Sequence, residues 1–221
     1  MTVKVLADFA RDAARELAGI LPSSGSVVLT GGGTAESVYP ELARARPDWS
    51  GLDVFFSDER CVPPDDPASN YGMANRTLLS AVGPRTVHRM QGEIDPHEAA
   101  AIYDELVVDP FDAVILGLGD DAHVAGLFPG SPGLLEAASC VVVDRPDGMQ
   151  GLSLTPSALL SGRRIVFVVS GASKAEAVRR AVAADEDVMD CPAAMFRDHG
   201  SVTFLLDEAA ASKLRGGRPT T

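Results

Sequence analysis

The sequence predicts an α/β fold with a Rossmann-like, mostly parallel sheet and helices on both faces. Apolar runs of strand length alternate with amphipathic helical stretches along most of the 221 residues, and such alternation implies right-handed crossovers between parallel strands. The run Ala113–Leu116 contains no polar residue, which is typical of a strand buried on both faces. Because 46% of the residues are apolar and no linker-like stretch divides the chain, we expect one domain over residues 1–221.

Local composition and periodicity place the expected elements along the chain. Branched and aromatic residues predict strands at Ser26–Thr30, Leu52–Ser57, Thr86–Arg89, Ala113–Gly117, Cys140–Val143, Arg164–Ser170 and Ser201–Leu206. Helical spacing of apolar residues predicts helices at Asp8–Leu21, Thr34–Arg46, Asn70–Ser80, Pro96–Val107, Ser173–Ala184 and Glu208–Leu214. The stretch Gly216–Thr221 is expected to be a frayed tail.

The charge and the absence of targeting signals limit the partners. A formal net charge of −12 argues against binding to nucleic acid or to an anionic membrane. An anionic ligand would therefore need a local basic pocket. The sequence has no signal-peptide pattern and no apolar run long enough to span a bilayer. We expect a cytoplasmic protein that is a monomer rather than an oligomer.

The cysteines and histidines indicate neither disulfides nor a metal. Cys61, Cys140 and Cys191 are odd in number and far apart, without metal-ligand spacing. No histidine has a histidine partner four residues away, and no histidine-carboxylate cluster with metal spacing occurs. We therefore expect chemistry without a metal or a cofactor.

The first loop with chemical potential follows the predicted strand Ser26–Thr30. The glycines Gly31, Gly32 and Gly33 lead through Thr34 into a helix. Glycines let backbone N–H groups turn inward, and a helix N-terminus adds partial positive charge, so the loop suits a phosphate. It is not the G-x-G-x-x-G pattern of dinucleotide-binding proteins. The alternative is a tight strand-to-helix turn that needs a positive φ.

The second loop follows the strand Leu52–Ser57 and begins Asp58-Glu59-Arg60. Arg60 is placed to bind a phosphate or carboxylate while an acidic neighbour orients it. Further on, Asn70 begins a helix whose Arg76 is a candidate second cation. The charged triplet is equally compatible with a solvated turn.

The third loop places His123 just beyond the strand Ala113–Gly117. Ligands of open parallel sheets bind in the crevice outside the carboxyl ends of the strands, and imidazole titrates near neutral pH. An ordinary histidine satisfied by a neighbouring carbonyl is the alternative. Together, the three loops beyond three strand ends supply a phosphate cradle, a cation and an acid/base group, which favours a sugar-phosphate ligand.

These segments also resemble a known family. The resemblance covers residues from about 25 to 212 in one register, and it rests on the segments Thr30–Thr34, Ser57–Pro63, Ser69–Tyr71, Leu116–His123, Leu127–Gly130 and Val202–Asp207. The chain is similar in all of them to the 6-phosphogluconolactonase family. That resemblance implies a sugar-phosphate isomerase/deaminase-like fold and metal-free hydrolysis of 6-phosphogluconolactone, a phosphorylated sugar lactone, in the oxidative pentose phosphate pathway.

The resemblance also implies roles for individual residues. His123 matches the family's proposed acid/base, and Asp121 matches the acid that precedes it. The substrate-binding residues that we expect on this basis, together with the loop analysis above, are Gly31, Gly32, Gly33, Thr34, Asp58, Arg60, Asn70, Arg76 and Lys174. Lys174 belongs to a segment, Ser170–Lys174, that lies beyond another strand; an exposed lysine in a first helical turn is the alternative interpretation.

The chain departs from the family pattern at two positions. Ala122 stands where the family usually has glycine, at a position that can favour a positive φ. Gly151 stands where the family tends to have a basic residue, so one phosphate contact is missing, and Arg145 or Lys174 are candidates to compensate.

Two other functions are compatible with the same motifs. An amino-sugar-phosphate deaminase or isomerase would share the glycine loop and the histidine, but such enzymes typically continue into Asn-Glu-Pro, where this chain has Leu127–Gly130. A non-catalytic sugar-phosphate sensor normally carries a DNA-binding helix-turn-helix segment, and only about 25 residues precede the first expected strand. The lactonase is the favoured prediction.

Overall fold

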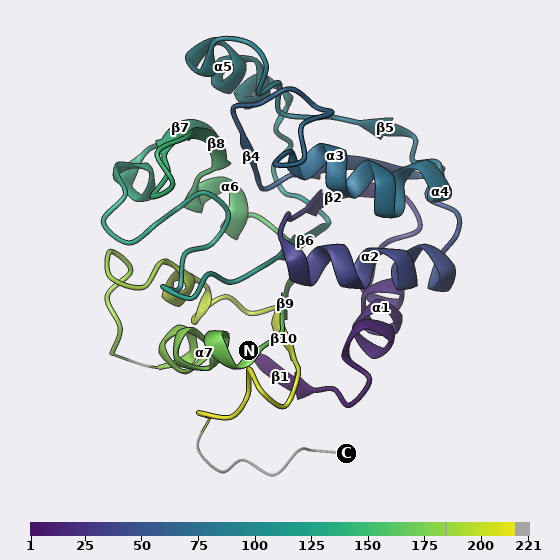
Figure 1. Cartoon of the computed structure of the whole chain (residues 1–221), viewed down its shortest axis with the longest axis vertical. Helices are drawn as coiled ribbons and strands as arrows, with labels where there is room; N and C mark the ends of the chain where they lie inside the picture. Colours follow the sequence, from purple (N-terminus) through teal and green to yellow (C-terminus); the bar gives the residue numbers. More distant parts are fainter. Residues whose placement is uncertain (184, 215–221) are drawn as a thin grey trace.

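A seven-stranded parallel sheet forms the centre of the computed structural model, which describes residues 1–183 and 185–214 (Figure 1). Its strands, in spatial order, are β1 (Thr2–Val5), β10 (Val202–Leu206), β9 (Ile165–Val169), β6 (Ala113–Leu116), β2 (Gly25–Leu29), β3 (Leu52–Phe56) and β5 (Thr86–Val87). Every neighbouring pair is parallel. The predicted α/β class with a mostly parallel sheet is confirmed.

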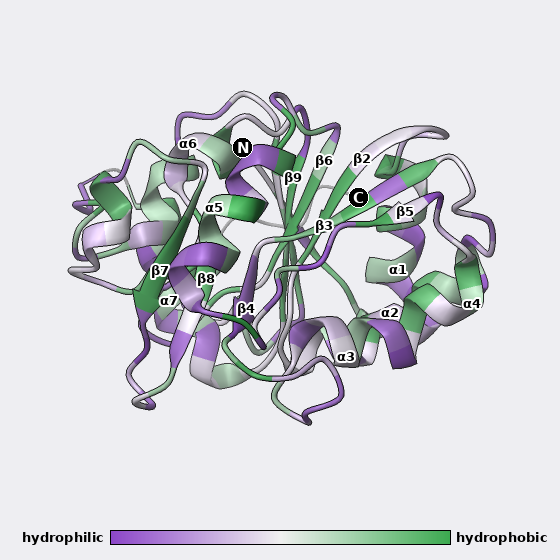
Figure 2. Cartoon of the chain, turned by 90° about the horizontal axis from the view of Figure 1, so that it is seen from above, coloured by the Kyte–Doolittle hydropathy of each residue, from purple (hydrophilic) through white to green (hydrophobic). Residues whose placement is uncertain are grey.

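Helices cover both faces of this sheet (Figure 2). One face carries α1 (Phe9–Ile20), α2 (Gly33–Ala45), α3 (Asn70–Ala74), a π-helical turn (Asn75–Leu79) and α4 (Ser80–Val82). The other carries α5 (Pro96–Leu106), α6 (Pro156–Leu160) and α7 (Ala175–Val182).

Strand β6 shows why both faces need a cover. Its side chains Val114 and Leu116 belong to the core under α5 to α7, and Ala113 and Ile115 belong to the core under α1 to α4. Successive side chains of a strand point to opposite faces, so an all-apolar strand buries both.

A small antiparallel sheet lies beside the main one, in the order β4 (Asp58–Arg60), β8 (Gln150–Leu154) and β7 (Cys140–Asp144). Strand β4 continues from β3 after the single residue Ser57. The segment predicted as a strand at Cys140–Val143 belongs to this sheet and not to the parallel one. This second sheet carries the Asp58-Glu59-Arg60 loop away from the end of β3 and pairs it with β8.

Three predictions of secondary structure were wrong in detail. The expected helix Glu208–Leu214 is a series of turns, in which Asp207 accepts a hydrogen bond from the Ala210 N–H. The expected helix Asn70–Ser80 is divided into α3, the π-helical turn and α4. Strands β1 and β8 were not among the expected strands. The predicted frayed tail Gly216–Thr221 lies outside the described residues.

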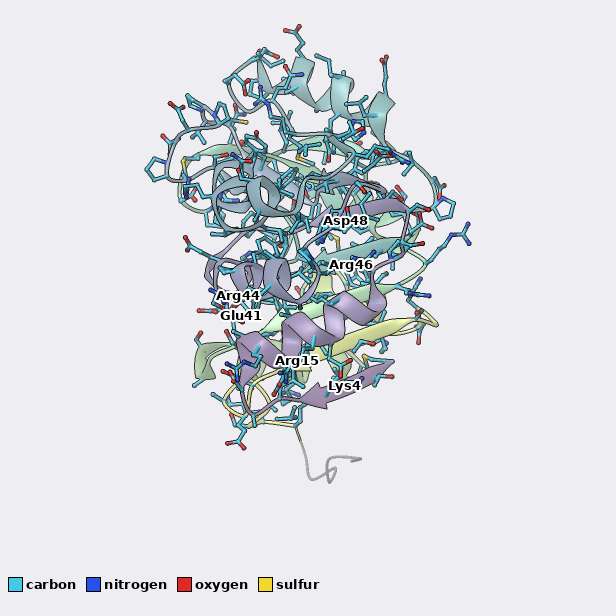
Figure 3. All side chains as sticks on the ribbon, turned by 90° about the vertical axis from the view of Figure 1, so that its right-hand side faces the viewer. Lys4, Arg15, Glu41, Arg44, Arg46 and Asp48 are labelled. Carbon is cyan, nitrogen blue, oxygen red and sulfur yellow. The ribbon has the colours of Figure 1, made fainter. Side chains whose placement is uncertain are left out.

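Surface charges on the face that carries α1 are paired with one another (Figure 3). Lys4 Nζ lies 2.8 Å from Glu16, Arg15 lies 3.4 Å from Asp12, and Arg44 pairs with Glu41. Exposed pairs of this kind contribute little to stability.

Within the described residues, no helix is both long and apolar enough to cross a membrane.

Candidate active site

The order of the strands in the main sheet determines where a ligand site is expected. From β2 the chain moves to β3 and β5 on one side, whereas β6 lies on the other side of β2. Ligands of open α/β sheets bind where the strand order reverses in this way, beyond the carboxyl ends. The loops after β2 and β6 meet there, because the Gly117 N–H donates to Thr30 Oγ1 at 3.2 Å.

A cavity of about 300 Å³ opens at this point. Its lining comes from four loops beyond strand ends and from the small sheet: Thr30, Gly31, Gly32, Gly33, Thr34, Asp58, Arg60, Asn70, Gly117, Leu118, Gly119, His123, Ala125, Arg145 and Lys174. The lining thus combines glycine-loop backbone, basic side chains and the imidazole.

The glycine loop joins β2 to the N-terminus of α2. A Cβ at Gly31 would lie 1.8 Å from Oδ1 of Asn70, so only glycine fits there. Gly32 has φ +91° and caps α2 without a side chain, which leaves the first N–H groups of that helix for a ligand. Thr34 Oγ1 lies 3.1 Å from Ser170 Oγ, which ties the loop to the end of β9.

A buried carboxylate fixes the second loop. Glu59 is 2% exposed and accepts hydrogen bonds from the backbone N–H groups of Arg60, Asn70 and Tyr71 at 2.7–2.8 Å and from Ser69 Oγ at 2.9 Å. Burial raises the pKa of the Glu59 carboxyl, and these four donors act against that rise. Glu59 thus joins β4 to the start of α3.

Asn70 transmits this anchoring to Arg60. Its Nδ2 donates to the Asp58 backbone carbonyl at 2.8 Å and to Asp58 Oδ2 at 3.0 Å. Its Oδ1 accepts from the Arg60 guanidinium. Arg60 is therefore oriented by a neutral amide and not by a carboxylate.

Arg60 and Arg76 differ from the other basic residues of the described chain. All other lysines and arginines of residues 1–183 and 185–214 pair with a carboxylate, except Arg46 and Arg164, which donate to backbone carbonyls. Both Arg60 and Arg76 line a second cavity of about 160 Å³ that shares Gly32, Gly33 and Asn70 with the first. In a chain with net charge −12, two arginines without an ion-pair partner beside a helix N-terminus are a candidate anion site.

His123 is held by Asp121. Its Nδ1 lies 2.7 Å from Asp121 Oδ1, which also accepts the His123 backbone N–H at 3.0 Å. With Nδ1 engaged by the carboxylate, Nε2 is the nitrogen left for chemistry. The Phe128 ring packs on the imidazole, with ring centroids 4.5 Å apart.

The backbone around His123 is tightly constrained. Ala122 is fully buried with φ +70°, a backbone conformation that residues with a side chain rarely adopt. A Cβ at Gly119 would lie 2.0 Å from His123 Nδ1 and 2.6 Å from Asp121 Oδ1, so Gly119 makes room for the pair.

Lys174 enters the cavity from the turn after β9. Its ammonium pairs with Asp120, which also accepts from Ser173 Oγ at 3.2 Å. This lysine holds the pKa of Asp120 below its usual range. Its side chain is only 24% exposed, so it is not a solvated first-turn lysine.

Comparison with known proteins identifies the family. The family described as "Glucosamine-6-phosphate isomerases/6-phosphogluconolactonase" matches residues 2–204. The chain belongs to this family.

Curated members of the family are similar over most of their length. The 6-phosphogluconolactonase of Synechocystis sp. is 34% identical over 204 residues, covering 86% of this chain and 85% of the relative. The 6-phosphogluconolactonase of Streptomyces coelicolor is 36% identical over 217 residues, covering 86% of this chain and 82% of the relative.

Solved structures of family members have the same fold. The crystal structure of a devB protein superposes with a TM-score of 0.86 at 33% identity, covering 96% of this chain and 99% of that one. The 6-phosphogluconolactonase of Trypanosoma brucei superposes with a TM-score of 0.82 at 26% identity, with 96% and 98% covered. The predicted sugar-phosphate isomerase/deaminase-like fold is confirmed. A monomeric glucosamine-6-phosphate deaminase at 24% identity, with a TM-score of 0.84, shares that fold.

Most of the residues predicted to form the site of this family member meet in the larger cavity. Its lining includes the glycine loop, Asp58, Arg60, Asn70, His123 and Lys174. Asp121 supports His123 and does not line the cavity, and Arg76 lies in the adjoining one. The described residues contain no group of three or more His, Cys, Asp or Glu side chains arranged to hold a metal.

The site also contains residues that the motif analysis did not assign. Gly117, Leu118 and Ala125 line the cavity from the β6 loop, and Arg145 lines it from the end of β7. In the sequence, Arg145 is one of two candidates to replace the basic residue that is missing at position 151. No local pattern distinguishes it from a surface arginine.

Proposed function

We propose that this protein hydrolyses 6-phosphogluconolactone to 6-phosphogluconate. The observation that carries the proposal is the pairing of His123 with Asp121 in the larger cavity, next to the second cavity that Arg60 and Arg76 line. This second cavity is called the subpocket below. Family membership and the two bacterial relatives named 6-phosphogluconolactonase support the same substrate.

The phosphate of the substrate would occupy the subpocket. Its two negative charges would be met by Arg60, by Arg76 and by the N-terminus of α2 behind Gly32 and Gly33. Binding at this end would hold the lactone ring in the larger cavity and orient its carbonyl toward the imidazole. Asp58 and Lys174 would then face the ring.

The reaction needs one group that moves a proton. Nε2 of neutral His123 accepts a proton from water while the water oxygen bonds to the lactone carbonyl carbon. The bond between that carbon and the ring oxygen then breaks, and the imidazolium returns its proton to the ring oxygen. Asp121 holds Nδ1, so that Nε2 is the nitrogen that accepts and returns the proton. Its negative charge stabilises the imidazolium between these two steps. General acid-base catalysis of this kind contributes roughly 10² to 10⁴ in rate.

The wider setting is part of the proposal. A cytoplasmic monomer acting in the oxidative pentose phosphate pathway, without a metal or a cofactor, fits the substrate. The free thiols of Cys61, Cys140 and Cys191 suit a reducing compartment.

The test is hydrolysis of freshly generated 6-phosphogluconolactone at a pH where the spontaneous reaction is slow. We expect clear acceleration by the wild type, and a loss of about 10²- to 10⁴-fold in kcat for His123→Ala. His97→Ala is the matched control, because His97 is an exposed histidine at the start of α5.

Two results would contradict the proposal. Undiminished hydrolysis by His123→Ala would remove the imidazole from the mechanism. The second result is a wild type that does not accelerate hydrolysis. If it still binds 6-phosphogluconate, a sensor is favoured. If it releases ammonia from glucosamine 6-phosphate, a deaminase is favoured.

A further inference from the structure

Arg145 has an unusual position for an arginine in a hairpin. It directly follows β7, and its N–H donates to the Met149 carbonyl at 3.0 Å across the turn that leads to β8. Turn residues at the end of a hairpin are normally solvated, yet the Arg145 side chain is only 11% exposed. Arg145 is one of the residues that line the larger cavity.

A glycine across the hairpin makes this conformation possible. A Cβ at Gly151 would lie 3.2 Å from Arg145 Cδ and 2.9 Å from the Glu59 carbonyl oxygen. A side chain at position 151 would therefore press on Arg145 and, more closely, on the Glu59 backbone. Gly151 and Arg145 form a matched pair, in which the glycine allows the arginine to reach the cavity.

The guanidinium shares one aromatic ring with His123. Arg145 Cζ lies 5.6 Å from the centroid of the Phe128 ring, which also packs on the imidazole. Arg145 Nε lies 3.2 Å from Asp147 Oδ2. In the described part of the chain, the two terminal nitrogens of Arg145 donate no hydrogen bond to a protein acceptor. They remain for a ligand in the cavity.

Arg145 belongs to the imidazole end of the cavity. The subpocket that contains Arg60 and Arg76 is not lined by Arg145. If the phosphate occupies that subpocket, then Arg145 faces the part of the substrate beside His123.

We propose that Arg145 contacts the lactone end of the substrate and donates its terminal N–H groups to the carbonyl oxygen, which becomes an oxyanion when water attacks. This inference rests on the proposed function. A donor aimed at charge that develops in the transition state raises kcat more than it improves ground-state binding. The Phe128 face and Asp147 hold the guanidinium so that it need not reorganise during the reaction.

The experiment compares Arg145→Met, Arg145→Lys and the control Arg163→Met for hydrolysis of 6-phosphogluconolactone. Arg163 matches Arg145 in having an Nε paired with one aspartate, Asp112, but it is 64% exposed and does not line either cavity. We expect Arg145→Met to lower kcat about 10- to 100-fold, since losing one oxyanion donor costs roughly 10²- to 10³-fold and other donors remain. The inhibition constant for inorganic phosphate should change little, because Arg145 does not line the subpocket that contains Arg60 and Arg76.

The lysine and glycine variants sharpen the assignment. Arg145→Lys keeps the charge but loses the planar fork over Phe128, so we expect only partial recovery of kcat. Gly151→Ala should lower kcat by displacing Arg145, and it should cause little further loss when added to Arg145→Met. If Gly151→Ala lowers kcat as much in the Arg145→Met variant as in the wild type, then position 151 acts through Glu59 and not through Arg145.

The outcomes separate this inference from the proposed function. If Arg145→Met keeps the kcat of wild type and Arg163→Met, the inference is wrong while the proposed function stands. If Arg145→Met raises KM and the inhibition constant for inorganic phosphate at unchanged kcat, the arginine binds the phosphate and the lactone-end assignment is overturned. A wild type without any acceleration would overturn the proposed function and this inference together.

Discussion

The two ends of the cavity hold their positive groups in different ways. At the end proposed for the phosphate, Arg60 and Arg76 have no carboxylate partner in the part of the chain that the structure describes. Asn70, a neutral amide, orients Arg60. Glu36 lines the same subpocket without an ion pair to either arginine. Neither arginine at this end forms an ion pair within the described residues, and Glu36 is the one acidic side chain in the lining of the subpocket.

At the other end each basic group has its own acid. The pairs are His123 with Asp121, Lys174 with Asp120, and Arg145 with Asp147. The three acids are 45%, 62% and 43% exposed, so water weakens each pair. A permanently charged phosphate requires net positive charge, whereas a neutral lactone requires oriented groups that respond when charge develops. The contrast suggests a division of roles, in which the arginine end binds the phosphate and the imidazole end carries out the chemistry.

Removing both unpaired arginines is the strongest test of this division. We expect Arg60→Met with Arg76→Met to lower kcat/KM for the phosphorylated lactone about 10²- to 10⁴-fold, because each hydrogen bond to a charged group contributes roughly 1.5–3 kcal/mol. Hydrolysis of gluconolactone without a phosphate should be unaffected. Arg44→Met, which removes an exposed arginine paired with Glu41, is the control. Equal losses on both substrates would contradict the division.

Substitution of Asp121 tests the imidazole end of the cavity. Asp121→Asn keeps the size of the side chain but removes the charge beside His123 Nδ1. We expect kcat to fall about 10- to 100-fold with little change in KM, because the imidazolium is less well stabilised. Asp198→Asn, at a side chain that is 91% exposed, is the control. A rise in KM at constant kcat would assign Asp121 to binding.

Glu59 tests how the arginine end is supported. Glu59→Gln places an amide N–H₂ among four donors, so we expect a loss of about 1–3 kcal/mol in the free energy of unfolding at neutral pH. A severalfold rise in KM should accompany it, since Asn70 and Arg60 lose their anchor. Chemical denaturation and steady-state kinetics measure the two effects.

The pH dependence of stability tests the same residue. Because burial raises the pKa of Glu59, the folded state binds a proton at higher pH than the unfolded chain does. The resulting stabilisation is complete below the unfolded value of 4.5 and is lost as the pH rises through the folded pKa. Glu59→Gln has no such titration. The wild type should therefore lose stability relative to the variant between a pH of 4.5 and neutrality, and a constant difference would contradict this.

The sequence predicts the elements whose signals are local. Buried strands such as Ala113–Leu116 have uninterrupted apolar runs, and the loops after them contain the glycines and charges that a ligand requires. The sequence marks Ala122 as a departure from the family's glycine, and the structure shows that the alanine adopts a positive φ there. Strand β1 gives no comparable signal, since all four of its residues are exposed.

Other features depend on tertiary structure. The expected helix Glu208–Leu214 is replaced by turns, in which the N–H groups of Ser212 and Leu214 bond to carbonyls three residues back instead of four. The proximity of Arg145 to His123 requires the pairing of β7 with β8, the absence of a side chain at Gly151 and the position of Phe128. None of these relations appears as a motif along the chain.

The Phe128 ring has a consequence for how such a site can evolve. Because His123 and Arg145 pack on the same ring, a substitution at position 128 would disturb both side chains at once. The effects of mutations at the three positions should therefore be epistatic rather than additive. Evolutionary change at this end of the cavity is expected to proceed by coordinated replacements.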